Sequence, residues 1–95
     1  MTGGVEVLLP GVLADLAGGL RRLEVRPAEA TLAGLLDALG AEHPVLERRI
    51  RDEAGALRRF VNVYVDGEDV RFTGGLAAAV PGGAVVQVLP SVAGG

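Results

Sequence analysis

Few side chains of this chain could take part in a reaction. Its 95 residues include no cysteine, no lysine and a single histidine, His43. Without cysteine there can be no disulfide, iron–sulfur cluster, thiolate zinc site or cysteine nucleophile. One histidine alone forms neither a histidine-based metal site nor a catalytic triad, and we expect His43, next to Pro44, to be a solvated helix-end residue. The sequence therefore predicts no catalytic residue and no metal-binding residue.

The C-terminus, Val92-Ala93-Gly94-Gly95, offers a different reactive group. Its side chains shrink towards the end, so the chain can enter a narrow channel and adopt backbone angles that are closed to other residues. The Gly95 carboxylate is ionised at neutral pH and can attack the α-phosphate of a nucleotide. The resulting acyl adenylate could then react with a sulfur nucleophile to leave a thiocarboxylate. The alternative is a frayed terminus without function, because the chain contains four other glycine pairs.

The elements that must position this terminus belong to one small domain. Hydrophobic residues make up 49% of the chain but aromatic residues only 3%, so the core must be built from Leu, Val and Ala. Alternating apolar residues bounded by turn residues predict strands at 5–9, 20–26, 59–65, 68–72 and 84–90. The small residues of 11–19 predict a loop or wide turn.

A helical period replaces the alternation in the middle of the chain. Its apolar positions follow the i, i+3, i+4, i+7 pattern of an amphipathic helix: Leu32, Leu35, Leu36 and Leu39. We expect Thr31 to be its N-cap and Gly40 to follow its end.

A shorter helix is predicted to begin at Pro44. Its inward-facing residues are predicted to be Val45, Leu46 and Ile50. Its arginines, Arg48, Arg49 and Arg51, are expected to face solvent; the alternative is an arginine-based anion site.

The predicted order β-β-α-β-β-β indicates an α+β fold of the β-grasp type, with a mixed sheet of about five strands packed on one main helix. In this topology the first and last strands lie side by side and parallel. Residues 1–90 would form the domain, and 91–95 a flexible tail beyond the edge of the sheet.

Aromatic residues suggest where a partner could bind. Phe60 and Tyr64 could join Leu89 in an exposed apolar patch; the alternative is that they pack under a loop. We expect Phe72 to be structural. A net charge of −3 gives no sign of nucleic-acid binding. No signal peptide or membrane-spanning stretch is evident, so we expect a cytoplasmic protein.

The sequences of two segments resemble those of a known family. Residues 59–80, RFVNVYVDGEDVRFTGGLAAAV, and 89–95, LPSVAGG, resemble the small sulfur-carrier proteins of the MoaD/ThiS type, which are ubiquitin-like β-grasp domains. The likeness is greatest to the branch that serves cysteine synthesis in actinobacteria. Where such carriers often have an acidic Asp-Gly-Asp turn, this chain has Pro81-Gly82-Gly83-Ala84.

The resemblance implies that Gly95 is the covalent site and that Gly94, Ala93 and Val92 are recognised as the tail. It also implies an ATP-dependent partner, related to ubiquitin-activating enzymes, that adenylates and thiolates Gly95. In the cysteine branch, a pyridoxal-phosphate cysteine synthase would accept the sulfur and a metalloprotease would release the product. ATP and pyridoxal phosphate would belong to those partners, and this chain would be a carrier rather than an enzyme.

Three alternatives stay open at this point. The sulfur could serve molybdopterin or a secondary metabolite instead of cysteine. The chain could be a ubiquitin-like modifier that is conjugated to other proteins, although without lysine it cannot extend itself through side-chain isopeptide bonds. It could also be a passive interaction module with an inert tail.

Overall fold

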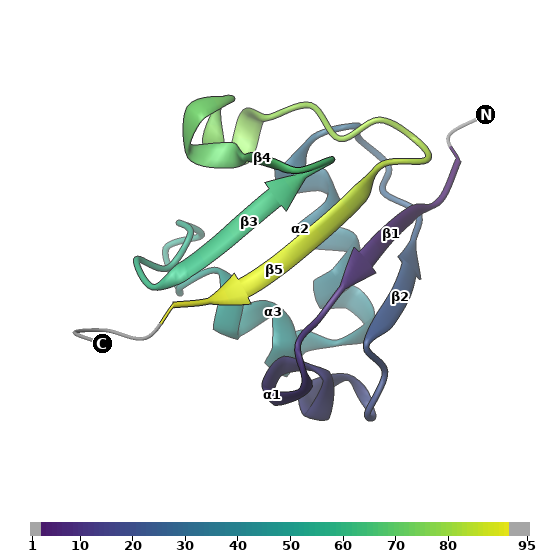
Figure 1. The fold of residues 1–95 in the computed structure, drawn as a ribbon, viewed down its shortest axis with the longest axis vertical. Helices are drawn as coiled ribbons and strands as arrows, with labels where there is room; N and C mark the ends of the chain where they lie inside the picture. The colour runs from purple at the N-terminus through teal and green to yellow at the C-terminus, as the bar shows by residue number, and fades with distance from the viewer. Residues whose placement is uncertain (1–2, 92–95) are drawn as a thin grey trace.

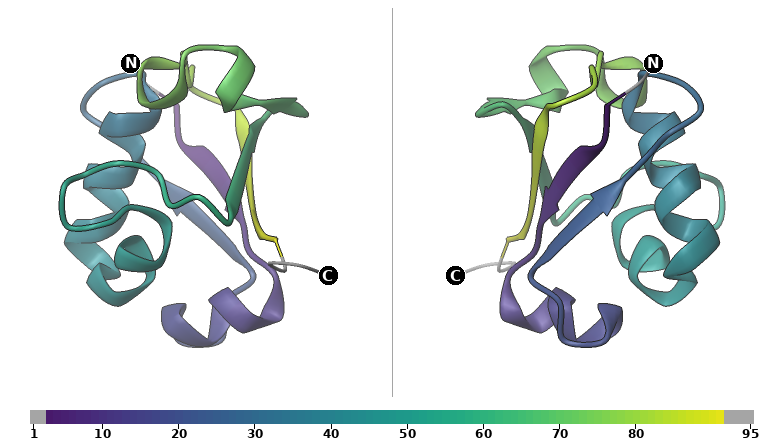
Figure 2. Two further views of the ribbon diagram at one scale, coloured as in Figure 1. Left: turned by 90° about the vertical axis from the view of Figure 1, so that its left-hand side faces the viewer. Right: turned by 90° about the vertical axis from the view of Figure 1, so that its right-hand side faces the viewer.

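The computed structural model describes residues 3–91. The elements are β1 (Val5–Leu8), α1 (Gly11–Ala14), β2 (Arg22–Val25), α2 (Leu32–Glu42), α3 (Pro44–Ile50), β3 (Val61–Val65), β4 (Glu68–Asp69) and β5 (Val85–Pro90), with short 3₁₀ turns at Asp15–Ala17, Val70–Phe72 and Gly75–Ala77. The five strands form one sheet, and α2 and α3 cover one of its faces (Figures 1 and 2).

The sheet has the predicted mixed topology, with strand order β2-β1-β5-β3-β4. The central pair, β1 and β5, is parallel, and Val7 lies opposite Val86. The other pairs, β1–β2, β3–β5 and β3–β4, are antiparallel. Because β1 and β5 are parallel neighbours, their C-terminal ends lie side by side at the same end of the sheet. The segment after β1 therefore lies beside the point where the chain leaves β5 (Figure 1).

The core joins one sheet face to the leucine stripe of α2. All four predicted leucines are buried, and so are Leu46 and Ile50 of α3. From the sheet, alternate residues of β1, β2, β3 and β5 complete the core: Val5, Val7, Leu23, Val25, Val61, Val63, Val86 and Val88. Each such leucine contributes about 1.5–3 kcal/mol when it is removed from water, so this face fixes how the helices sit on the sheet.

The loop predicted for 11–19 is wrong, because this segment folds as α1 and a 3₁₀ turn. The carbonyl of Pro10 accepts hydrogen bonds from the backbone N–H groups of Leu13 and Ala14 at 3.0 and 2.8 Å. The side chains of Leu13, Ala14 and Ala17 are buried against the core. Tertiary burial therefore stabilises this helical turn. The segment is short and has glycines at both ends, so its sequence alone did not indicate a helix.

The N-cap of α2 is confirmed, since the Thr31 hydroxyl accepts a hydrogen bond from the backbone N–H of Gly34 at 3.1 Å. The predicted end at Gly40 is wrong: α2 continues to Glu42 and stops at His43, the residue before Pro44, where proline disfavours helical angles. Gly40 is a point of close approach instead. A Cβ there would lie 3.1 Å from the side chain of Glu47 on α3.

All five predicted strands are shorter in the structure, and the one expected at 20–26 spans only Arg22–Val25. The strand expected at 59–65 begins only at Val61, and the one expected at 68–72 ends at Asp69. There the Asp69 carboxylate accepts a hydrogen bond from the backbone N–H of Arg71 and turns the chain into a 3₁₀ turn. This turn leaves the side chain of Phe72 87% exposed, so its predicted structural role is wrong.

Within residues 3–91, no helix combines the length and the apolar character that crossing a membrane requires.

Candidate functional site

The described part of the chain ends where β5 leaves the sheet. Pro90 lies opposite Val61 of β3, and the backbone N–H of Ser91 donates a hydrogen bond to the carbonyl of Phe60 at 2.7 Å. The backbone is thus held by β3 up to Ser91. The predicted covalent and tail residues, Gly95, Gly94, Ala93 and Val92, lie outside the described residues.

A groove of about 470 Å³ adjoins Ser91, and we call it the tail-root groove. Its lining residues come from α1, α3, the start of β3 and the end of β5. These segments lie at the end of the sheet where both β1 and β5 end (Figure 1). Its walls combine apolar residues with three arginines: Val12, Leu13, Val45, Arg48, Arg49, Arg58, Phe60, Val61, Pro90 and Ser91. Three of the apolar side chains are well exposed, namely Val12 (65%), Val45 (58%) and Phe60 (50%).

The structure divides the predicted partner patch. Phe60 is exposed and lines the tail-root groove, whereas Tyr64 and Leu89 do not line it. They are half-buried on the sheet face that α2 and α3 do not cover, where Leu89 pairs with Asn62 and Tyr64 with Gln87. Tyr64 and Leu89 are therefore diagonal neighbours on that face, and Phe60 belongs with residues of α1 and α3.

The sequence did not single out Val12, Val45 or Arg58 as site residues. Val45 was predicted to face the core, which is wrong. The core of α3 needs only Leu46 and Ile50, four residues apart on one face. Val45 lies outside that spacing, and this was the sequence signal that its apolar side chain could be exposed. Val12 could not be found in this way, because its segment was predicted as a loop.

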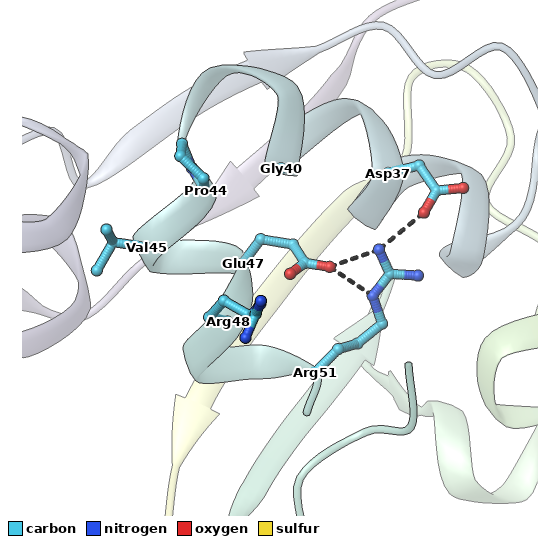
Figure 3. A pocket seen from close by; sticks show the side chains of 7 residues that line it. All are labelled: Asp37, Gly40, Pro44, Val45, Glu47, Arg48 and Arg51. Carbon is cyan, nitrogen blue, oxygen red and sulfur yellow. Dashed lines mark hydrogen bonds and ion pairs between the residues drawn. The ribbon is translucent and has the colours of Figure 1, made fainter. Parts of the chain in front are cut away.

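Arg51 does not face solvent as predicted, since its side chain is only 13% exposed. Its guanidinium donates to Glu47 and to Asp37 of α2, each at 2.7 Å (Figure 3). Burial alone would lower the pKa of Arg51, but the hydrogen bonds and charges of these carboxylates raise that pKa above its ordinary value. The hollow of about 530 Å³ at this cluster therefore contains carboxylates that already have a partner.

The arginines of the tail-root groove have different surroundings. Arg48 and Arg49 are exposed, as predicted. Arg58 donates through Nε to the backbone carbonyl of Arg48 at 2.6 Å, which holds its guanidinium at the groove without neutralising it. Within residues 3–91, the one ion pair that these three arginines form joins Arg48 to Glu53 at 3.7 Å, between well exposed side chains. No acidic residue is among those that line the groove, so its wall is positively charged.

The described residues contain no group of three or more His, Asp or Glu side chains that could hold a metal ion. What this end of the molecule offers is a positively charged, partly apolar surface beside the origin of the last four residues.

The chain is similar to known small carrier and modifier proteins. A model described as the ThiS family matches residues 7–95. The chain is 42% identical over 93 residues to the sulfur carrier protein CysO of Mycobacterium tuberculosis, covering 96% of this chain and 98% of that protein. It is 36% identical over 84 residues to small archaeal modifier protein 1 of Haloferax volcanii, covering 87% and 91% of the two chains.

Solved structures agree with this result. The fold is similar to a chain in the crystal structure of the Amycolatopsis orientalis BexX/CysO complex, with a TM-score of 0.86 and 41% sequence identity. That match covers 96% of this chain and 99% of the other. The predicted β-grasp fold and the resemblance to sulfur carriers are both confirmed.

Proposed function

Since the chain belongs to the ThiS family, we propose that it carries sulfur as a thiocarboxylate on Gly95, most directly for the synthesis of cysteine. The observation that carries this proposal is the 42% identity to a sulfur carrier protein along nearly the whole length of both chains. The match to the ThiS family extends through Gly95 of this chain.

The proposed reaction has two steps, both catalysed by an ATP-dependent partner related to ubiquitin-activating enzymes. A carboxylate oxygen of Gly95 attacks the α-phosphorus of ATP and pyrophosphate leaves, giving an acyl adenylate. Hydrosulfide, or a donor that delivers it, attacks the carbonyl carbon. The bond from that carbon to the phosphate oxygen breaks, and AMP and a proton leave. The product is a thiocarboxylate at the C-terminus.

This chain contributes presentation rather than catalysis. The β3–β5 pairing holds the backbone through Ser91, and four residues remain from there to Gly95. Fully extended, four residues reach at most about 14 Å. Ala93, Gly94 and Gly95 have small side chains or none, so they fit a narrow channel in the partner. A pyridoxal-phosphate synthase would then accept the sulfur, and a metalloprotease would release the product. ATP and pyridoxal phosphate would be bound by these partner enzymes and not by this chain.

A second candidate function is conjugation to other proteins as a ubiquitin-like modifier. The 36% identity to small archaeal modifier protein 1 favours it. The two functions share the acyl adenylate and differ in the nucleophile that attacks it, which is sulfur for a carrier and a lysine amine for a modifier.

Intact-mass measurement tests the proposal and separates these functions. The chain is incubated with the activating enzyme of the same genome, ATP and a sulfide donor. We expect the mass change of one oxygen-for-sulfur exchange, localised to Gly95 by fragmentation, and no change in a variant that lacks Gly95. Adducts on protein lysines without any exchange would favour the modifier. Absence of both products with every activating enzyme of that genome would refute the carrier function.

A further inference from the structure

We propose that the tail-root groove is the docking surface for a segment of the activating enzyme that carries acidic side chains around an apolar one. This inference rests on the proposed function, because it concerns the enzyme that must receive Gly95. It adds to that function a second contact, outside the last four residues, that determines how tightly the enzyme holds this chain.

The last four residues limit how far the activating enzyme can lie from the groove. An enzyme that holds Gly95 in its active site must bring that site within about 14 Å of Ser91, and Ser91 itself lines the groove. The rim of any channel that admits the tail therefore faces the tail-root groove or the adjoining sheet edge. The groove lies within the footprint that the reaction itself requires.

Charge is the second argument. Arg48, Arg49 and Arg58 line the groove with no acidic residue among the other lining residues, on a chain whose net charge is −3. The hydrogen bond from Arg58 to the carbonyl of Arg48 fixes one guanidinium before any partner arrives. A partner segment rich in aspartate or glutamate would find complementary charges here. Such complementarity raises association rates and excludes wrong partners.

Exposed apolar area is the third argument. Five large apolar side chains are exposed within residues 3–91, and three of them, Val12, Val45 and Phe60, line this one groove. They come from three separate segments, so the fold rather than local sequence gathers them. Apolar side chains surrounded by arginines form the pattern of an interface centre with a polar rim. One apolar side chain of the partner would fill the centre.

Two other occupants fit less well. The chain's own last residues could place their carboxylate on the arginines, but the conformational entropy lost when four residues are ordered exceeds what an exposed ion pair contributes. A second copy of this chain would bring its own three arginines against these three, and like charges repel.

A matched pair of charge reversals tests the proposal. The groove variant is Arg48→Glu with Arg49→Glu. The control is Arg22→Glu with Arg26→Glu, which changes the net charge equally at exposed positions on and beside β2 at the far edge of the sheet. We expect the KM for thiocarboxylate formation and the Kd for the activating enzyme to rise about tenfold or more in the groove variant. In the control they should change less than about twofold.

Equal effects of the two variants, or none, would overturn the docking surface while wild-type loading leaves the carrier function intact. Faster loading by the groove variant would identify the chain's own tail as the occupant, and a wild-type dimer that the groove variant disrupts would identify a second copy; each overturns the proposal. If the wild type binds the enzyme through the groove but is never loaded, the docking surface stands and the carrier function falls. Thermal unfolding of both variants checks that they are folded.

Discussion

Arg49 and Arg51 are two residues apart at the end of the same short helix, but their surroundings are opposite. Arg51 is nearly buried between Glu47 and Asp37, which neutralise it and link α3 to α2. Arg49 is exposed and lines the tail-root groove, among residues that include two other arginines and no acid. Because α3 ends at Ile50 and Arg51 is its extended C-cap, two neighbouring arginines differ: one charge serves the fold, and the other is exposed to another molecule.

The difference shows that arginines of one short segment can have two separate roles, stabilising the fold and binding a partner. A charge that is already paired inside the molecule has little left to offer a partner, and its removal should affect stability. A charge without a counter-charge adds little to stability and keeps its full attraction for a partner. The two arginine groups should therefore fail in different assays.

Replacing Arg51 should give the largest effect, and it should be on stability. Arg51→Ala leaves the nearly buried carboxylate of Glu47 without its cation, at a cost of about 2 kcal/mol. For a domain of this size the melting temperature should fall by about 10 °C. Thermal unfolding measures the loss, and loading assayed well below the melting temperature should be unchanged. Arg26→Ala, at an exposed ion pair, is the matched control and should cost less than about 1 kcal/mol.

The sign of the pH dependence follows from the raised pKa of Arg51. A cation with a raised pKa in the folded state stabilises the fold below its unfolded pKa. That stability is lost only as the pH rises through the folded value. Since arginine is protonated throughout the neutral and moderately alkaline range in both the folded and the unfolded state, the penalty of Arg51→Ala should not diminish between about pH 7 and 10. A penalty that disappears in this range would contradict the assignment of Arg51 as a charged link between α2 and α3.

The two phenylalanines extend the comparison to apolar residues. Phe60 lines the tail-root groove, and Phe72 is exposed in the turn after β4 without lining that groove. Phe60→Ala should raise the KM for loading about tenfold, because a half-exposed ring at an interface centre contributes about 1–2 kcal/mol. Phe72→Ala should change it less than about twofold. Steady-state loading kinetics measure both, and equal values would show that exposed aromatic area alone, rather than the groove, determines binding.

The sequence predicted those parts of the molecule that depend on regular spacing. The leucines of α2 and the alternating valines of the strands indicated which faces are buried, and the element order indicated that β1 and β5 are parallel. The covalent site at Gly95 was suggested by position and family wording, and it stays a prediction. The groove could not be predicted. It needs α1, which tertiary burial stabilises, and it needs three segments that approach one another only in the fold.

The same limit applies to the arginines. In the sequence Arg48, Arg49 and Arg51 form one charged run, and a run of this kind is typical of a solvated helix face. Glu47 stands four residues before Arg51, the spacing of a helical ion pair, but the second carboxylate, that of Asp37, lies 14 residues from Arg51 along the chain. Its role depends on how α2 and α3 cross, which the close approach at Gly40 permits. Pairing across two elements has no signal in local spacing.

Salt should produce the smallest effect and make the comparison sharpest. Raising the salt concentration from about 50 to 500 mM shortens the Debye length from more than 10 Å to less than 5 Å. The KM for loading of the wild type should rise about threefold to fivefold, because the groove arginines are exposed and their attraction for the partner is screened. The variant with Arg48→Glu and Arg49→Glu should lose this dependence or reverse it.

Over the same range the melting temperature should change little, since the half-buried pairs of Arg51 are screened less than exposed charges. Loading kinetics and thermal unfolding on the same samples measure both quantities. If the melting temperature falls with salt while loading does not, the two arginine groups have been assigned the wrong way round: the groove charges would serve the fold, and the charge between Glu47 and Asp37 would be the one that meets the partner.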